Sequence, residues 1–264
     1  MRRLAVFAAA CIMSAAALAQ DAVAVYAAGS LREALNEVAA LWQARGGTHV
    51  AFTFGASGLL RERIEQGEPA QVFASADTDH PQRLANAGGW HAPVVFTRNA
   101  LCALAAPQVD VTSQTLLQTI LRPDVRLGTS TPRADPSGDY AWAMFRRAEA
   151  VHPGAQALLE AKALQLTGNP TSASPPAGRG TYAWIMDSGQ ADVFLTYCTN
   201  AVASQREVPR LKVVQLPPEL QVGAAYGLTV RMGAPAAARD FAAYVLSPPA
   251  QAVFARLGFL EARQ

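Results

Sequence analysis

The sequence has few charged residues and no run of one sign. Only 16% of its 264 residues are charged, with 22 Lys and Arg against 20 Asp and Glu. Proteins that bind nucleic acid usually carry a basic patch or stripe, so we expect no nucleic-acid partner. Cysteine is scarce at 3 residues, and the 4 histidines have no spacing typical of metal ligands. Disulfide-rich scaffolds and zinc proteins are therefore not indicated.

Apolar residues, by contrast, are plentiful, at 51% of the chain. Disordered proteins combine low hydrophobicity with high net charge, and this chain shows the reverse. Glycine and proline, at 19 and 17 residues, are near ordinary usage, which excludes collagen-like and low-complexity classes. The length suits one or two folded domains with a substantial core.

The N-terminus has the pattern of a secretory signal peptide. Met1-Arg2-Arg3 is a short positive segment, an apolar stretch covers Leu4–Ala16, and Ala17-Leu18-Ala19 is a small-x-small cleavage signal. We expect residues 1–19 to be removed, so that the mature chain begins at Gln20. The apolar stretch is too short to span a bilayer comfortably, and no later segment reaches about 18 uncharged apolar residues. The protein should therefore be exported and soluble.

The three cysteines are candidates for lipid attachment or for a disulfide. Cys11 would be the acylated residue of a lipoprotein, an interpretation that we disfavour because the apolar stretch before it is too short. Cys102 and Cys198 both fall in predicted strands. A disulfide between them is permitted in an oxidising compartment, and two buried free thiols are equally compatible with the sequence.

The remaining chain alternates predicted strands with predicted helices, which is typical of parallel sheets flanked by helices. The alternation runs to about residue 99 and then resumes, so we expect an α/β fold in two lobes with a ligand cleft between them. The expected strands cover residues 22–26, 49–54, 71–75, 94–97, 101–104, 125–129, 193–197, 211–215 and 226–230. The expected helices cover residues 31–44, 57–66, 113–121, 182–188 and a segment from Asp139. Two more helices are expected at the end of the chain, the last with Ser247 as N-cap, Pro248 at its first position and Gly258 after its end.

Two Gly-Ser turns follow strands and open helices in the first half. Ser30 lies in Ala28-Gly29-Ser30, and Ser57 lies in Gly55-Ala56-Ser57-Gly58. The start of a helix has unpaired N–H donors and partial positive charge, which together suit an anion. The alternative is that each serine only caps its helix, and Ser30 with Glu33 fits a capping box.

The second half offers similar but weaker candidates. Asp135-Pro136-Ser137-Gly138 precedes a helix, although an ordinary Asp-Pro turn is an equally simple interpretation. Arg179 could bind an oxyanion through its guanidinium or be a solvated surface residue. Tyr197 could offer a phenol donor or be a core tyrosine.

Enzyme motifs find little support. Gly55-Ala-Ser-Gly-Leu59 lacks the final glycine of a G-x-S-x-G nucleophile elbow. Gly178-Arg-Gly-Thr-Tyr-Ala183 fits G-x-G-x-x-A but follows prolines instead of a strand. A secreted hydrolase that uses Ser57 or Ser137 stays open as an alternative, and it requires a histidine within hydrogen-bonding distance of the serine. We expect no enzyme activity and no cofactor.

Five segments together resemble the periplasmic molybdate-binding proteins of bacterial ABC importers, over nearly the whole mature chain. They are YAAGSLREAL (26–35), FTFGASGLLRERIEQGEPAQVFASAD (52–77), DPSGDYA (135–141), ADVFLTYCTNA (191–201) and AAYVLSPPAQAVFARLGF (242–259). The resemblance implies a two-lobed type II periplasmic binding fold, with residues 20–99 and 231–264 in one lobe and 100–230, including hinge strands, in the other. It also implies a monomer in the periplasm that serves an inner-membrane ABC permease with its cytoplasmic ATPase.

The resemblance further implies that molybdate or tungstate is held by neutral donors. Ser30 and Ser57 match the two serine contacts of the first lobe, Ser137 matches a backbone N–H donor, and Tyr197 matches a hydroxyl donor. The remaining backbone donor aligns near Arg179. An arginine there, together with the unusual loop over residues 168–180, departs from the family pattern and leaves sulfate, phosphate or a small carboxylate as alternative ligands.

Overall fold

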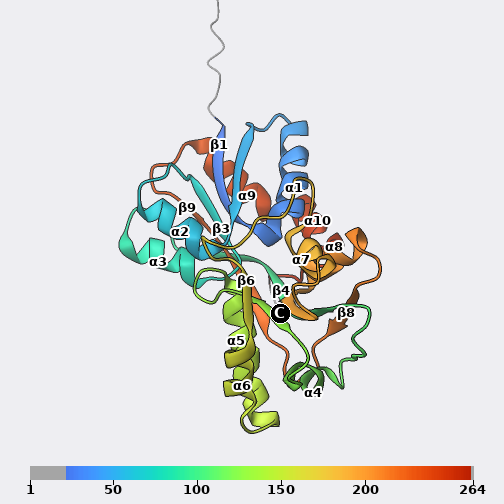
Figure 1. Cartoon of the computed structure of the whole chain (residues 1–264). Coiled ribbons are helices and arrows are strands. Elements are labelled where there is room, and N and C mark those ends of the chain that lie inside the picture. The colour runs from blue at the N-terminus through green and yellow to red at the C-terminus, as the bar shows by residue number, and fades with distance from the viewer. Residues whose placement is uncertain (1–21, 263–264) are drawn as a thin grey trace, which may run out of the picture.

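The computed structural model describes residues 22–262, which form two α/β lobes (Figure 1). The expected signal peptide over residues 1–19, with Cys11 and the mature start at Gln20, lies outside the described residues. The first lobe is uppermost in Figure 1. Its leading elements are β1 (Val23–Ala28), the 3-10 turn η1 (Gly29–Leu31), α1 (Arg32–Ala44), β2 (Val50–Gly55), α2 (Ser57–Glu65), β3 (Val72–Ser75) and α3 (Asp79–Ala87).

The long strand β4 (Val94–Ala105) leads into the second lobe, and the chain later returns to the first. The returning elements are β9 (Gly223–Val230), α9 (Ala236–Val245) and α10 (Pro248–Arg256); α9 packs on β1, β3 and β9, and α10 packs on α1. The second lobe contains α4 (Leu116–Leu121), β5 (Leu127–Ser130), α5 (Pro136–Val151), α6 (Ala155–Lys162), β6 (Leu164–Thr167), α7 (Thr181–Asp187), β7 (Val193–Tyr197), α8 (Cys198–Glu207) and β8 (Lys212–Gln215).

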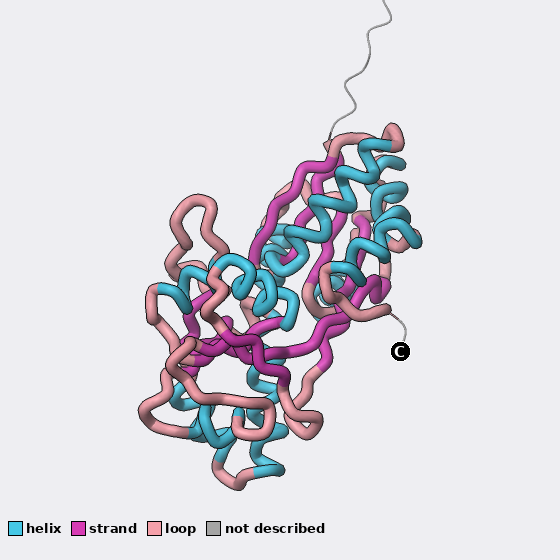
Figure 2. Tube along the Cα trace, turned by 90° about the vertical axis from the view of Figure 1, so that its right-hand side faces the viewer, coloured by secondary structure: helices cyan, strands magenta, loops and turns pink. Residues whose placement is uncertain are grey.

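The strands form one curled sheet with the order β2-β1-β3-β9-β4-β7-β5-β6, and β8 also pairs with β4. The outer strands are parallel: β1 with β2 and β3, and β5 with β6 and β7. The joining strands β4 and β9 are antiparallel to their neighbours. Figure 2 shows the strands of the two lobes running in different directions, with helices around each. The expected parallel sheets are therefore connected by an antiparallel centre.

β4 corrects the expectation of two separate strands over residues 94–97 and 101–104. It is continuous, and Val94–Ala100 pair with β9 while Leu101–Ala105 pair with β7. The polar Asn99 interrupts the apolar pattern of the sequence, yet its side chain is only 1% exposed. Its amide groups are hydrogen-bonded within the protein, so a buried strand tolerates it.

Each lobe has its own hydrophobic core. In the first lobe, Leu35 and Phe241 are buried among the helices and β1. In the second lobe, Leu104, Phe145 and Phe194 form the corresponding centre. Full burial of one such side chain contributes about 1.5–3 kcal/mol. Because the two cores are separate, the lobes are able to behave as two bodies joined through β4 and β9.

The two lobes touch at both ends of the space between them. The backbone N–H of Gly58 at the start of α2 donates to the carbonyl of Ala134 at 2.9 Å. At the other end, Arg206 of α8 pairs with Glu33 of α1 at 3.3 Å. A Cβ at Gly58 would lie 2.4 Å from the carbonyl oxygen of Arg133, so only glycine permits this approach.

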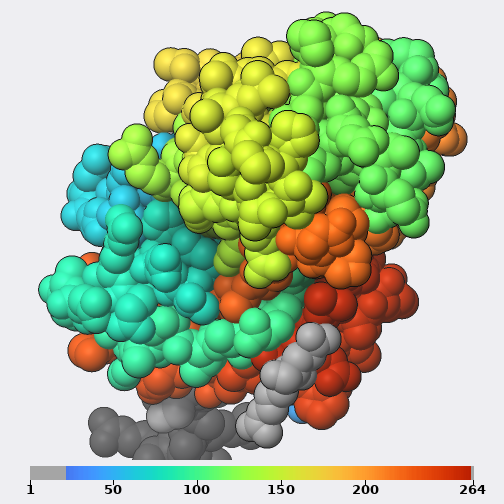
Figure 3. Space-filling view, turned by 90° about the horizontal axis from the view of Figure 1, so that it is seen from below, coloured from blue at the N-terminus to red at the C-terminus, as the bar shows by residue number. Residues whose placement is uncertain are grey.

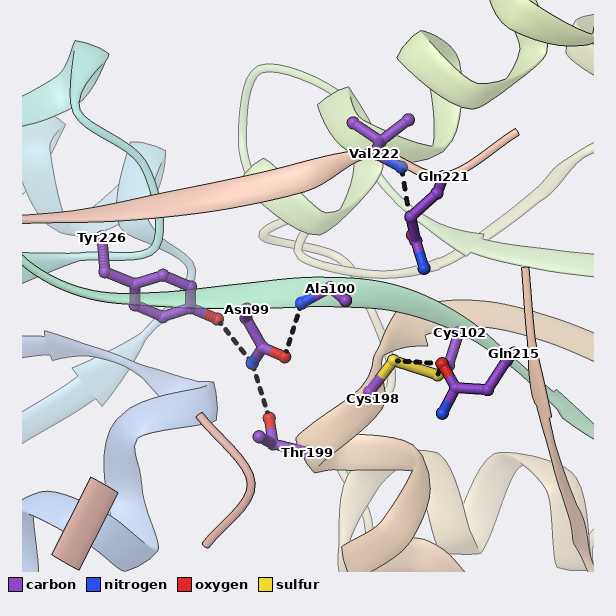
Figure 4. Close-up of a disulfide and its surroundings, with 9 residues drawn as sticks. All are labelled: Asn99, Ala100, Cys102, Cys198, Thr199, Gln215, Gln221, Val222 and Tyr226. Carbon is purple, nitrogen blue, oxygen red and sulfur yellow. Dashed lines mark hydrogen bonds between the residues drawn. A yellow bond between two sulfur atoms is a disulfide. The ribbon is translucent and has the colours of Figure 1, made fainter. Parts of the chain in front are cut away.

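A disulfide joins Cys102 of β4 to Cys198 at the start of α8 (Figure 4). Cys198 was expected in a strand, whereas it is the first residue of α8. The bond connects the strand that crosses between the lobes with the residue after Tyr197. It therefore fixes one wall of the interlobe space to the hinge.

The lower face of the molecule is dominated by the second lobe. Figure 3 shows the yellow-green residues of α5 and α6 at the centre of this face, beside the blue-green residues of the first lobe. None of the helices within residues 22–262 is long and apolar enough to cross a bilayer. Three helices that the sequence pattern did not predict, α3, α6 and α8, complete the layers around the sheet.

Candidate functional site

A cleft of about 840 Å³ lies between the lobes. Its first-lobe wall comes from the starts of α1 and α2, and its second-lobe wall comes from the starts of α5, α7 and α8. Ligand sites of α/β proteins commonly lie at such edges, beyond the ends of the strands. Of the residues singled out in the sequence, Ser30, Ser57, Tyr197 and Arg179 line the cleft, and Ser137 does not.

Ser30 does not cap α1, so the alternative interpretation, a capping box with Glu33, is wrong. It lies inside the 3-10 turn Gly29–Leu31, and the residue that caps α1 is Leu31. The turn directs the Ser30 hydroxyl to the Tyr226 hydroxyl of β9, at 3.0 Å. Ser30 is partly exposed and lines the cleft. Its hydroxyl is therefore free of the helix and available to a ligand.

Ser57 also differs from a plain helix cap. The N-cap of α2 is Ala56, and Ser57 is the first helical residue. Its buried Oγ accepts the backbone N–H of Ala76, at 3.1 Å. Because the oxygen accepts there, the hydroxyl proton is left to donate to another group. The side chain is thus held at the cleft wall as a donor.

Tyr197 reaches across the space between the lobes. It ends β7 in the second lobe, and its hydroxyl donates to the carbonyl of Ala76 in the first lobe at 3.3 Å. Its ring packs against Tyr140 and Tyr226. Burial raises the pKa of Tyr197 well above its ordinary value, so the phenol keeps its proton and remains a donor. The same peptide segment at Ala76 thus contacts both Ser57 and Tyr197.

The N–H of Ser137 is already occupied. Asp135 is the N-cap of α5, and its carboxylate accepts the Ser137 N–H at 3.1 Å. Asp135 itself lines the cleft, where burial raises its pKa to about 6. The Ser137 hydroxyl is buried and has no hydrogen-bond partner among the described residues. The N–H expected to bind the ion therefore serves the helix cap in this structure.

Arg179 is likewise engaged within its own lobe. Its guanidinium pairs with Glu207 at 2.5 Å and with Asp187 at 3.0 Å. Glu207 also accepts the backbone N–H of Gly180, the N-cap of α7, at 2.9 Å. Two carboxylates thus already engage two of its five N–H donors, and the role of Arg179 in holding an anion stays a prediction.

Sequence reasoning missed three polar residues around the cleft. Asp135 had a usable signal, since Asp followed by Pro at the first helical position is a helix-start pattern. Tyr226 had none, because it looks like an ordinary strand residue until the sheet brings it to Ser30. Asn99 had none either, because it lies between two expected strands and its bond to Tyr226 depends on the pairing of β4 with β9. Arg32 also lines the cleft, with its guanidinium carbon 4.4 Å from the centre of the Phe54 ring.

Within residues 22–262, the structure shows neither a serine nucleophile paired with a histidine nor a cluster of metal ligands. Ser57 Oγ is bonded to a backbone N–H, and both ring nitrogens of the buried His80 lack hydrogen-bond partners within residues 22–262. No serine–histidine pair is therefore formed at Ser57. Within the same residues, no group of three or more His, Cys, Asp or Glu side chains is placed to hold a metal ion. The arrangement is suited to hydrogen-bonding an acceptor-rich ligand.

The comparisons with known proteins agree with this geometry. The model of the bacterial extracellular solute-binding protein family matches residues 23–260. The chain is 37% identical over 209 residues to the uncharacterized protein PM1146 of Pasteurella multocida, covering 77% of this chain and 85% of that protein. It is 28% identical over 251 residues to the molybdate-binding protein ModA of Mycobacterium tuberculosis, covering 90% of this chain and 84% of that protein.

The fold has close counterparts among solved structures. The sulfate-binding protein SubI from Mycobacterium tuberculosis superposes with a TM-score of 0.76 at 18% identity, covering 92% of this chain and 88% of that chain. At this identity the likeness shows the fold, which is the two-lobed type II fold of periplasmic binding proteins. Together with the family match over nearly the whole described chain, it places this protein in the bacterial extracellular solute-binding protein family.

Proposed function

We propose that this protein captures molybdate or tungstate and delivers it to an inner-membrane ABC permease with its cytoplasmic ATPase. Membership of the solute-binding family implies a periplasmic location, an ABC importer as partner and an anion as ligand. The signal peptide over residues 1–19 belongs to the same proposal, as does a monomeric state. The mechanism is binding and hinge closure about β4 and β9, without chemical conversion of the ion.

One observation carries the proposal: the hydroxyls of Ser30 and Ser57 line the same cleft as the Tyr197 hydroxyl of the second lobe, which can exchange its bond to the Ala76 carbonyl for one to the ion. Ser30 and Ser57 stand at the starts of two neighbouring helices, and Tyr197 approaches from the opposite lobe. Helix starts add the partial positive charge of their unpaired N–H groups. Neutral donors of this kind respond to the geometry of an oxyanion, so cavity shape and donor positions set selectivity.

A second candidate is another anion, namely sulfate, phosphate or a small carboxylate. Within this candidate, the cleft volume of about 840 Å³ favours a carboxylate over sulfate and phosphate, since sites of 300–1,000 Å³ hold organic ligands. The lobes already touch at Gly58 and at Glu33, so this space remains in a structure whose lobes are in contact. A compact tetrahedral ion would leave much of it to water or would require further closure.

A ligand panel separates these candidates. The purified protein is titrated calorimetrically with molybdate, tungstate, sulfate, phosphate and a small carboxylate such as lactate, with sodium chloride at matched ionic strength as control. We expect molybdate and tungstate to bind most tightly and to raise the unfolding temperature most. Tighter binding of a carboxylate or of phosphate would replace the first candidate by the second. Absence of binding throughout would refute both.

A further inference from the structure

The Ser30 hydroxyl is connected to the hinge strand by a chain of buried polar groups. Its Oγ lies 3.0 Å from the Tyr226 hydroxyl, and Nδ2 of Asn99 lies 3.4 Å from that same hydroxyl. Nδ2 also donates to Oγ1 of Thr199 at 2.8 Å (Figure 4). Asn99 and Tyr226 are 1% and 0% exposed. Three separated segments of the chain thus meet behind one cleft residue.

The direction of donation along this series of hydrogen bonds is set at Asn99. The backbone N–H of Ala100 donates to Oδ1 of Asn99 at 2.9 Å, which fixes the orientation of the side-chain amide. An amide nitrogen is only a donor. Its two hydrogens therefore point to Thr199 and Tyr226, and both of these hydroxyl oxygens act as acceptors toward Asn99.

The donor and acceptor roles at Tyr226 follow from those at Asn99. Burial raises the pKa of the Tyr226 phenol, so the hydroxyl keeps a proton to donate. The structure places two groups within hydrogen-bonding distance of that hydroxyl, Nδ2 of Asn99 and Oγ of Ser30. Of these two, only the serine oxygen can accept. Tyr226 therefore donates to Ser30.

We propose that Asn99 and Tyr226 are positioning residues whose one-directional hydrogen bonds turn the Ser30 hydroxyl into a donor toward the bound ion. Since Ser30 Oγ accepts from Tyr226, the proton of Ser30 itself is directed to the cleft. This inference rests on the proposed function and adds a requirement to it. A ligand oxygen at Ser30 must present a lone pair to the serine proton, which an unprotonated oxygen does in every orientation.

Ser57 imposes the same requirement on the first-lobe wall. Its Oγ accepts from the N–H of Ala76, so its proton also remains for the ligand. Two adjacent donors favour fully deprotonated oxyanions such as molybdate, tungstate and sulfate. Hydrogenphosphate, which retains a proton at neutral pH, must turn its protonated oxygen away from this wall. Asp135 on the opposite wall is the acceptor that could receive it.

A double-mutant cycle tests the hydrogen-bond relay, by which we mean the bonds that run from Asn99 through Tyr226 to Ser30. Molybdate and sulfate are the probes in calorimetry. The variants are Ser30→Ala, Tyr226→Phe and the double variant. We expect Tyr226→Phe to weaken binding roughly fivefold in the wild-type background and to have no effect once Ser30 is alanine. The matched control is Tyr26→Phe, which removes another tyrosine hydroxyl of the same sheet, bonded to Glu68 at 2.5 Å. That variant should bind like the wild type.

A second arm reverses the direction of the relay. Asn99→Asp replaces the donor by an acceptor, so that Tyr226 donates to the new carboxyl group and Ser30 turns its lone pairs to the cleft. We expect binding to fall more than in Tyr226→Phe, by roughly tenfold or more. Adding Ser30→Ala to Asn99→Asp should restore part of the affinity, because the substitution removes the repelling serine oxygen and leaves a methyl group.

The outcomes separate the two levels of the proposal. A wild-type protein that binds molybdate or sulfate, combined with additive effects of Ser30→Ala and Tyr226→Phe, overturns the relay and leaves the proposed function standing. A wild-type protein that binds neither probe overturns the proposed function and the relay with it. If Asn99→Asp does not fold, the Tyr226→Phe cycle still decides the question.

Discussion

The helix starts of the two lobes differ in whether their donors are free to bind a ligand. In the first lobe, the hydroxyls of Ser30 and Ser57 accept from inside the lobe and keep their protons for the cleft. In the second lobe, carboxylates of the lobe itself occupy the donors. Asp135 takes the Ser137 N–H, and Glu207 takes the Gly180 N–H.

Under the proposed function, this difference assigns the anchoring of the anion to the first lobe and the closure over it to the second. An anion that approaches the start of α5 or α7 must displace a carboxylate or lie beside it, and either event costs free energy. The neutral serines impose no such cost. Tyr197 of the second lobe lines the cleft and has no carboxylate partner among the described residues, but its hydroxyl donates to the Ala76 carbonyl. It contacts the ion on closure only by exchanging that bond for one to the ligand.

Removing the disulfide tests how firmly the second-lobe wall is held, and it has the largest expected effect. Replacing Cys102 and Cys198 by alanine frees a loop with a sequence separation of 96. We expect the free energy of unfolding to fall by about 2–5 kcal/mol, measured by urea denaturation. A reductant should destabilise the wild type and leave the double variant unchanged. A wild type insensitive to reductant would show that the core alone positions this wall.

Ser57→Ala tests the first-lobe anchor directly. The variant loses a donor to the ion, and we expect oxyanion affinity to fall by about 1–3 kcal/mol in calorimetry. Its matched control is Ser188→Ala, whose hydroxyl lies outside the cleft lining, donates to carbonyls of α7 at Trp184 and Ile185, and accepts from the Gln190 amide. Unchanged affinity in Ser57→Ala would remove Ser57 from the site.

Asp135→Asn makes the second lobe more like the first. An asparagine oxygen can still accept the Ser137 N–H, but the negative charge at the cleft is gone. We expect oxyanion affinity at pH 7 to rise by about 1 kcal/mol, while Asp124→Asn, an exposed carboxylate paired with Arg122, should have no effect. Weaker binding in Asp135→Asn would mean that the carboxylate itself contacts the ligand.

The same residue gives a pH dependence with a definite sign. Burial raises the pKa of folded Asp135 to about 6 from an unfolded value of 3.8. Between these values the folded state holds more protons than the unfolded state, so the contribution of Asp135 to stability declines as pH rises from about 4 to about 6. Asp135→Asn should remove this decline in urea unfolding measured across that range. An identical slope in the variant would assign it to other groups.

Much of the fold followed from local pattern. The strand–turn–helix alternation located both lobes, and α10 ends as expected, with Ser247 before it and Gly258 after it. Ser30, Ser57 and Tyr197 reached the cleft because parallel strands bring their ends to one edge. These features depend on residues close together in the chain.

What could not be predicted depends on partners distant in sequence. Ser30 meets Tyr226, which is 196 positions away, and Asn99 meets Thr199, which is 100 positions away. Whether a serine caps a helix or receives a proton from a tyrosine is decided by that partner. The occupation of second-lobe donors by Glu207 is likewise invisible until α7 and α8 pack together.

Arg179→Ala has the smallest expected effect and bears most sharply on the comparison of the lobes. Because its guanidinium pairs with Glu207 and Asp187, we expect oxyanion affinity to stay within about twofold and stability to change little, as for a surface ion pair. Arg210→Ala, which removes another partner of Asp187 outside the cleft lining, is the matched control. A tenfold loss of affinity in Arg179→Ala alone would mean that the guanidinium leaves its carboxylates for the ligand, and the anchor would then belong to the second lobe.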